Sequence, residues 1–103
     1  MKDLVQKLVQ TPGPSGYEHQ IRALVRQEVE PHADEIHVDN LGNLIARKGQ
    51  ARDDGLKVML AAHIDEIGIM VTHIDENGYA RFTNIGGLNR SNLLGGRVRF
   101  LDG

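Results

Sequence analysis

The sequence contains no cysteine and no tryptophan, and its aromatic residues are two tyrosines and two phenylalanines. Without cysteine the chain cannot form disulfides, thiolate metal ligands or a thiol nucleophile. So few aromatic side chains provide no platform on which nucleic-acid bases could stack. The formal net charge is -2, so the chain as a whole does not attract nucleic acid electrostatically either.

Long hydrophobic runs are also absent. In the N-terminal segment, MKDLVQKLVQ, charged and amide side chains interrupt the apolar residues, which is unlike a secretory signal or a membrane span. The length of 103 residues and the hydrophobic fraction of 40% are typical of one small globular domain. We therefore expect a soluble, cytoplasmic protein that binds neither nucleic acid nor a membrane.

The first third of the chain predicts two helices. Apolar residues at helical spacing form two stripes, the first ending before Pro12 and the second at Pro31. Ser15 and Glu18 have the spacing of a capping box, so Ser15 is expected to cap the second helix rather than act as a nucleophile. The stripes consist of Leu4, Val5, Leu8 and Val9, and of Ile21, Leu24, Val25 and Val29.

The remainder predicts mainly strands. A hairpin is expected from residue 35 to residue 46, with turn chemistry at residues 40–43, followed by a polar loop at residues 50–55. The almost wholly apolar residues 56–62 suit a strand covered on both faces, as in an α/β sheet. Asn77-Gly78 predicts a turn between strands at residues 67–74 and 79–83. Residues 85–96 are glycine-rich and irregular, and residues 97–101 alternate like a last strand.

The chain ends on Asp102-Gly103, a dipeptide typical of a hairpin turn, and no second strand follows it. Such an ending would leave the strand at residues 97–101 without a neighbour. We therefore expect the 103 residues to be a piece of a longer protein.

The most informative segment for chemistry follows the apolar run. His63 and Asp65 lie two residues apart, so on an extended backbone their side chains point to the same face. An imidazole can bind a metal through one nitrogen while a carboxylate holds the proton on the other. Asp65 or Glu66 could alternatively bind the metal directly. The competing interpretation is a histidine at a strand end followed by a solvated turn.

A zinc site needs at least three protein ligands, and the sequence does not show where others would come from. The further histidine candidates are His19, His32, His37 and His73. No HExxH motif, zinc-finger spacing or calcium loop is present. The glycine pairs at residues 86–87 and 95–96 lack the lysine of a phosphate-binding loop, so they predict turns.

Several motifs together resemble the tetrahedral aminopeptidases, also called glutamyl or deblocking aminopeptidases. These dinuclear metallopeptidases are often labelled endoglucanase or cellulase. The resemblance is collinear over nearly the whole chain and includes HIDEIG at residues 63–68. The other matching segments are PGPSGYE at residues 12–18, DNLGNL at residues 39–44, Asn77-Gly78, Phe82, residues 85–87 and residues 96–98.

The resemblance implies a hydrolase that releases N-terminal residues from peptides. His63 would bind one of two divalent metals, usually zinc or cobalt, Asp65 would orient or tune the site, and Glu66 would be a neighbour rather than a ligand. Residues 1–65 would begin a three-layer α/β/α catalytic domain. Residues 66–103 would begin a β-rich, barrel-like insertion that mediates dimer contacts within assemblies of twelve subunits.

The family's bridging aspartate, its general base and its other metal ligands have no counterpart in these 103 residues. Two catalytic metals need about five protein ligands, so the resemblance implies that this chain alone is inactive. Two alternatives remain. A non-catalytic β-rich domain could pair strands with a partner or a second copy. A carbohydrate hydrolase is disfavoured, because Asp65 and Glu66 are adjacent and tryptophan is absent.

Overall fold

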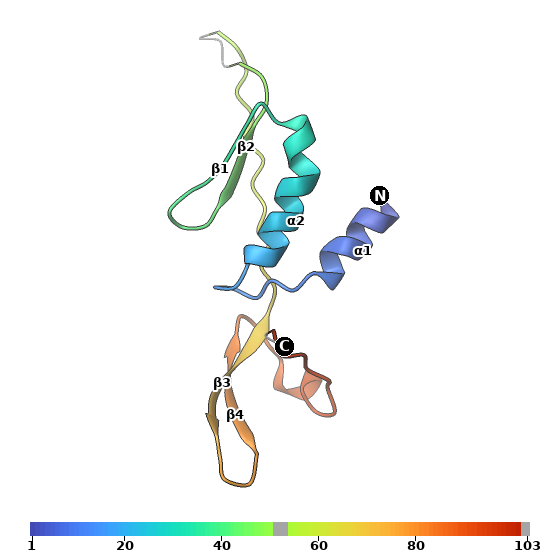
Figure 1. Cartoon of the computed structure of the whole chain (residues 1–103), viewed down its shortest axis with the longest axis vertical. Helices are drawn as coiled ribbons and strands as arrows, with labels where there is room; N and C mark the ends of the chain where they lie inside the picture. The colour runs from blue at the N-terminus through green and yellow to red at the C-terminus, as the bar shows by residue number, and fades with distance from the viewer. Residues whose placement is uncertain (51–53, 102–103) are drawn as a thin grey trace.

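The computed structural model describes residues 1–50 and 54–101 (Figure 1). The mixture of helices and strands agrees with the predicted α/β class. In chain order the elements are α1 (Lys2–Gln10), α2 (His19–Val29), the 3₁₀ helix η1 (Glu30–His32), β1 (Glu35–Val38), β2 (Leu44–Arg47), β3 (Gly68–Ile74), β4 (Ala80–Ile85) and the 3₁₀ helix η2 (Arg90–Asn92).

The molecule is elongated, with extents of 65 × 30 × 26 Å and a radius of gyration of 18.2 Å. A compact chain of this length would have a radius of gyration of about 13 Å. Among the described residues only Gly13, Pro14 and Ile21 are buried. Gly13 and Pro14 lie in the turn before α2, and Ile21 lies in α2 itself. This turn passes between the helices and the β3–β4 hairpin (Figure 1). Much apolar surface is therefore open on both sides of this crossing.

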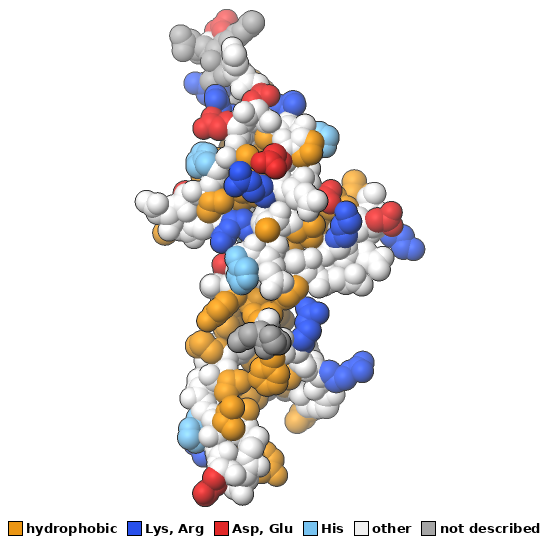
Figure 2. Space-filling model, in the orientation of Figure 1, with side chains coloured by type: hydrophobic (Ala, Val, Ile, Leu, Met, Phe, Trp, Pro, Cys, Tyr) orange, Lys and Arg blue, Asp and Glu red, His pale blue; other side chains and the backbone are white. Residues whose placement is uncertain are grey.

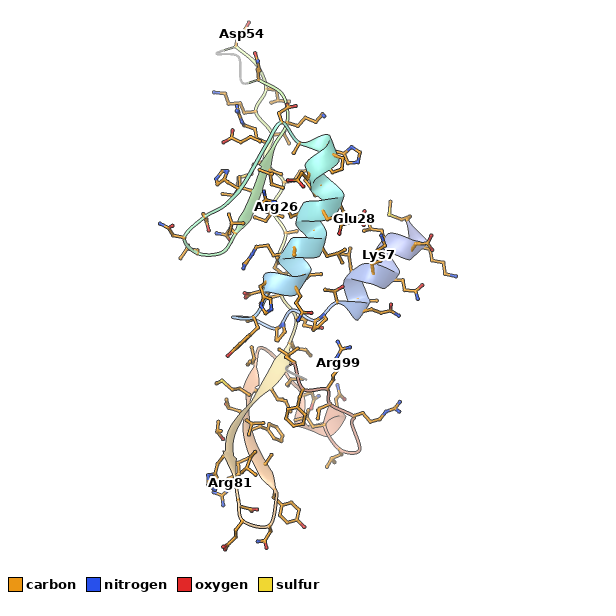
Figure 3. The ribbon with its side chains drawn as sticks, in the orientation of Figure 1. Lys7, Arg26, Glu28, Asp54, Arg81 and Arg99 are labelled. Atoms are coloured by element: carbon orange, nitrogen blue, oxygen red, sulfur yellow. The ribbon has the colours of Figure 1, made fainter. Side chains whose placement is uncertain are left out.

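Both predicted helices are present, and their ends follow the prolines. α1 ends at Gln10, just before Pro12, and α2 ends at Val29, although Pro31 lies within the following 3₁₀ turn. The ammonium of Lys7 on α1 lies 3.0 Å from a carboxylate oxygen of Glu28 on α2, which joins the two helices (Figure 3).

The predicted capping box is wrong. Glu18 is the residue that precedes α2, and no side chain in the described part of the chain caps this helix. The carboxylate of Glu18 accepts a hydrogen bond from the backbone N–H of Gly16 at 2.6 Å. The hydroxyl of Ser15 donates instead to the carboxylate of Asp65, which is a charge-assisted hydrogen bond.

The first hairpin forms as predicted. β1 and β2 pair antiparallel from Glu35 opposite Arg47 to Val38 opposite Leu44. In the connection, one carboxylate oxygen of Asp39 accepts hydrogen bonds from two backbone N–H groups, each at 2.9 Å. The hairpin lies alongside α2 (Figure 1).

The second hairpin is also confirmed. β3 and β4 pair antiparallel from Gly68 opposite Ile85 to Ile74 opposite Ala80, with an irregularity after Val71. Gly78 has a φ of +84°, which explains the glycine in this turn, since other residues rarely adopt that conformation.

Two predicted strands do not form. Residues 56–62 run without a strand partner, and Leu56 and Leu60 are each 93% exposed. Residues 97–101 are likewise irregular. A strand needs hydrogen-bonded neighbours, and the described part of the chain places none beside either segment. The predicted turn at Asp102-Gly103 and half of the predicted loop at residues 50–55 lie outside the described residues.

The described residues form two separate two-stranded sheets. A three-layer domain and a barrel-like insertion are both larger than these hairpins, so those two architectures stay predictions, as does the domain boundary after residue 65. None of the helices described is long and apolar enough to cross a membrane.

Candidate functional site

The site is built where two segments about fifty residues apart in sequence cross. The backbone N–H of Glu66 donates to the carbonyl of Gly13 at 2.9 Å, and the N–H of Gly13 donates to the Glu66 carboxylate at 3.0 Å. Pro14 and Glu66 form an isolated parallel bridge. A Cβ atom on Gly68 would lie 3.0 Å from the Cβ of Pro14, so glycine permits this close approach.

His63 and Asp65 contact each other at this crossing. Nδ1 of His63 lies 2.9 Å from Oδ1 of Asp65 and 3.1 Å from the Asp65 backbone carbonyl. The prediction that the two side chains share a face is therefore confirmed. An ionised carboxylate only accepts hydrogen bonds, so Nδ1 is the donor in this contact. In the neutral imidazole with this tautomer, Nε2 is the nitrogen that carries the lone pair.

Ser15 completes a line of three polar side chains. Its hydroxyl donates to Oδ2, the second carboxylate oxygen of Asp65. The hydroxyl of Ser15, and after it the imidazole of His63, hold the pKa of Asp65 below its usual value. Asp65 is therefore ionised at neutral pH. Sequence reasoning missed this role of Ser15, because Ser15 and Asp65 lie fifty residues apart.

The exposure of the two side chains differs in a way that matters for ligand binding. The side chain of His63 is 85% exposed, whereas that of Asp65 is 37% exposed. His63 adjoins a hollow of about 390 Å³ whose other walls include apolar residues of α1 and α2. The imidazole is thus open to a ligand while its carboxylate partner is partly enclosed.

The other histidines are not gathered around His63. They lie at the start of α2, in η1, in β1 and in β3, and are His19, His32, His37 and His73. Within the described ranges, no three histidine, aspartate or glutamate side chains are grouped so as to hold a metal ion. The Glu66 carboxylate is engaged by the backbone of Gly13. His63 with Asp65 therefore fits one ligand of a metal centre, with its supporting carboxylate.

Comparison with known proteins places the chain in a family. Residues 42–103 match the M42 glutamyl aminopeptidase model. A lysyl aminopeptidase of Pyrococcus furiosus is 48% identical over 100 residues, which are 95% of this chain and 28% of that relative.

Solved structures agree. An aminopeptidase from the archaeon Desulfurococcus kamchatkensis has a TM-score of 0.82 and 35% identity, over 88% of this chain and 25% of that one. A Thermotoga maritima structure titled endoglucanase has a TM-score of 0.73 and 36% identity, over 84% of this chain and 28% of that one. The chain spans less than a third of the length of these relatives. The resemblance drawn from the sequence motifs is confirmed, and the chain belongs to the M42 glutamyl aminopeptidase family.

Proposed function

We propose that this chain is the N-terminal part of a metal-dependent aminopeptidase and that His63 is one of its metal ligands. The observation that carries the proposal is the contact between Nδ1 of His63 and Asp65. This contact occupies Nδ1 and leaves Nε2 of an exposed imidazole available to a ligand. Histidines that bind metals commonly donate their other ring N–H to a carboxylate in this way. Membership of an aminopeptidase family supports a peptide as the substrate.

The resemblance to the family suggests two divalent metals, zinc or cobalt, which would polarise the scissile carbonyl and lower the pKa of a bound water. In this chain His63 would hold one of them through Nε2. Asp65 would keep the proton on Nδ1 and increase the basicity of the imidazole. Glu66 would secure the crossing through Gly13 rather than bind metal, as its hydrogen bond indicates.

The 103-residue chain by itself is proposed to be inactive. A pair of catalytic metals needs about five protein ligands, and no group of three is present among the described residues. A purified 103-residue chain should therefore not release N-terminal residues from peptides. Turnover by this chain that disappears in a His63→Ala variant would contradict the proposal.

Metal binding by the 103-residue chain tests the role of His63. Zn²⁺ and Co²⁺ are added while the imidazole resonances are followed by NMR. We expect a shift with Zn²⁺ and paramagnetic broadening with Co²⁺ at His63, and neither effect at the remaining imidazoles in His63→Ala. His73→Ala is the matched control, because His73 lies in β3 within the second hairpin. Binding that survives His63→Ala and disappears in His73→Ala would refute the assignment.

Activity is tested on a full-length protein that carries this chain. His63→Ala should abolish aminopeptidase turnover, and Asp65→Ala should lower metal affinity or activity by about 10–100-fold, the usual effect of losing a carboxylate that orients a metal-binding histidine. Cleavage of a glycan without cleavage of peptides would replace the proposal with the carbohydrate-hydrolase alternative.

We also propose that residues 66–103 begin a separate unit that mediates contact between copies of the protein. The β3–β4 hairpin presents exposed apolar side chains, including Met70, Ile74 and Phe82, which are 49%, 63% and 47% exposed. Figure 2 shows hydrophobic side chains gathered over this half of the molecule. An exposed apolar face of this kind is typical of an interface.

The oligomer is tested by light scattering after size-exclusion chromatography. Phe82→Ser should lower the mass of the assembly, while Arg81→Ser, the adjacent residue of β4 (Figure 3), should not. Circular dichroism checks that both variants remain folded. A wild-type chain that is monomeric, or a Phe82→Ser variant that assembles like wild type, would contradict the proposed interface.

A further inference from the structure

Ser15 has no place in the mechanism described so far, although it lies in the turn before α2 and touches the site. We propose that Ser15 is a positioning residue that fixes, through Asp65, which imidazole nitrogen of His63 faces a metal. This inference rests on the proposed function of His63.

The Asp65 carboxylate is held through both of its oxygens. Its Oδ2 accepts from the Ser15 hydroxyl, and its Oδ1 lies 2.9 Å from Nδ1 of His63. Two partners on two different oxygens leave the carboxylate little freedom to rotate. Oδ1 is thereby kept at the imidazole, where it holds the proton on Nδ1.

Packing cannot orient the imidazole instead. The His63 side chain is 85% exposed, so few neighbouring atoms restrict its rotation. The only hydrogen bonds found for its ring among the described residues are those from Nδ1 to Asp65. Both acceptors of Nδ1, the carboxylate and the backbone carbonyl, belong to Asp65. The choice of tautomer, and with it the availability of Nε2, therefore depends on how Asp65 is held.

Ser15 is itself presented by an anchored turn. Pro14 is buried and bridges to Glu66, and its carbonyl accepts from the N–H of Tyr17 at 2.8 Å. The Ser15 hydroxyl is therefore placed beside Asp65 by backbone contacts that do not involve His63. This arrangement is the support that a metal-binding histidine needs to be ordered before the metal arrives.

Removing the hydroxyl should free the Asp65 carboxylate and redistribute the proton of His63. Loss of a group that touches the histidine directly costs about 10–100-fold in metal affinity. Ser15 acts one contact further away, so we expect a smaller loss, about 3–10-fold. The tautomer should change even without metal.

The experiment uses the 103-residue chain and two readouts. The ¹⁵N chemical shifts of the imidazole report the tautomer of His63 in the absence of metal, and a Zn²⁺ titration reports affinity. Ser15→Ala should lower the Nδ1–H population and weaken Zn²⁺ binding about 3–10-fold, whereas Ser15→Thr, which keeps the hydroxyl, should restore both. Ser91→Ala is the control, because its hydroxyl bonds to Asn89 in another part of the chain.

A second matched pair guards against misfolding. Ser15→Thr and Ser15→Val have nearly the same shape and differ in the hydroxyl, so a difference in tautomer between them supports the proposal even if Ser15→Ala unfolds. An unchanged Nδ1–H population in the variants without the hydroxyl would overturn it. The tautomer measurement needs no metal, so it decides the role of Ser15 even if the 103-residue chain binds no Zn²⁺, whereas a full-length protein that keeps its turnover in His63→Ala would overturn the proposed function instead.

Discussion

The close packing of Gly13 against Ile21 predicts that Gly13→Ala destabilises the fold. A Cβ atom on Gly13 would lie 2.4 Å from Cγ2 and 3.0 Å from Cβ of Ile21. Ile21 is 5% exposed and sits in α2, where a β-branched side chain has essentially one rotamer. The side chain cannot turn away, so the turn must move off the helix.

The expected cost follows from this overlap. Inserting a methyl group into a tightly packed position costs about 1–3 kcal/mol. The displacement also strains the hydrogen bonds of 2.9 and 3.0 Å between Gly13 and Glu66. We therefore expect a decrease of about 1–3 kcal/mol in the free energy of unfolding, together with a perturbed His63 environment.

A double-mutant cycle isolates the cause. Ile21→Ala removes the atoms that a new Cβ would strike, so adding Gly13→Ala to it should cost much less than in wild type. The free energy of unfolding is measured in urea by circular dichroism. Gly87→Ala is the control, because no atom of the described residues lies within 4 Å of its new Cβ, and it should change stability by less than about 0.5 kcal/mol. Strict additivity of Gly13→Ala and Ile21→Ala, or a Gly13→Ala variant as stable as the control, would refute the reasoning.

Three further predictions concern the elements around the crossing. The Asn43 side-chain amide, with further hydrogen bonds, holds the pKa of Asp39 below its usual 3.8. The ionised form of Asp39 therefore stabilises the fold at neutral pH, and this contribution is lost as the pH falls below 3.8. The decrease in the free energy of unfolding during acid titration should be shallower in Asp39→Ala. Gly42 and Gly49 have φ values of +87° and +80°, so alanine at either should cost about 1–2 kcal/mol in urea unfolding, and no cost at both would contradict the backbone argument. Lys7→Ala breaks an exposed ion pair with α2 and should lower the free energy of unfolding by at most about 1 kcal/mol at low salt and by less at high salt. A larger, salt-independent decrease measured by thermal unfolding would show that Lys7 acts by packing.

The sequence predicted the elements whose causes are local. Pro12 ends the first helix, and Asn77-Gly78 forms a turn between adjacent strands. Each of these depends on residues only a few positions apart. The two strands that failed, at residues 56–62 and 97–101, depend on neighbours that the described residues do not place beside them, and an apolar pattern cannot supply a partner.

The candidate site shows the same division. The contact of His63 with Asp65 could be predicted, since residues two positions apart on an extended backbone share a face. The role of Ser15 could not, because local spacing favours a helix cap and the true partner is fifty residues away. The competition was decided by the crossing of the chain, which no local pattern encodes. The signal that the sequence offered for Ser15 was the PGPSGYE motif at residues 12–18, which resembles the family.

The crossing also bears on the order of events during folding. The helices and hairpins close over short sequence separations, so they can form within microseconds. The bonds from Gly13 to Glu66 and from Ser15 to Asp65 close loops of 53 and 50 residues, which carries a larger entropic cost. During synthesis the turn before α2 must wait for residues 65 and 66 to emerge from the ribosome. We expect the imidazole of His63 to gain its support among the last steps, after the flanking elements exist.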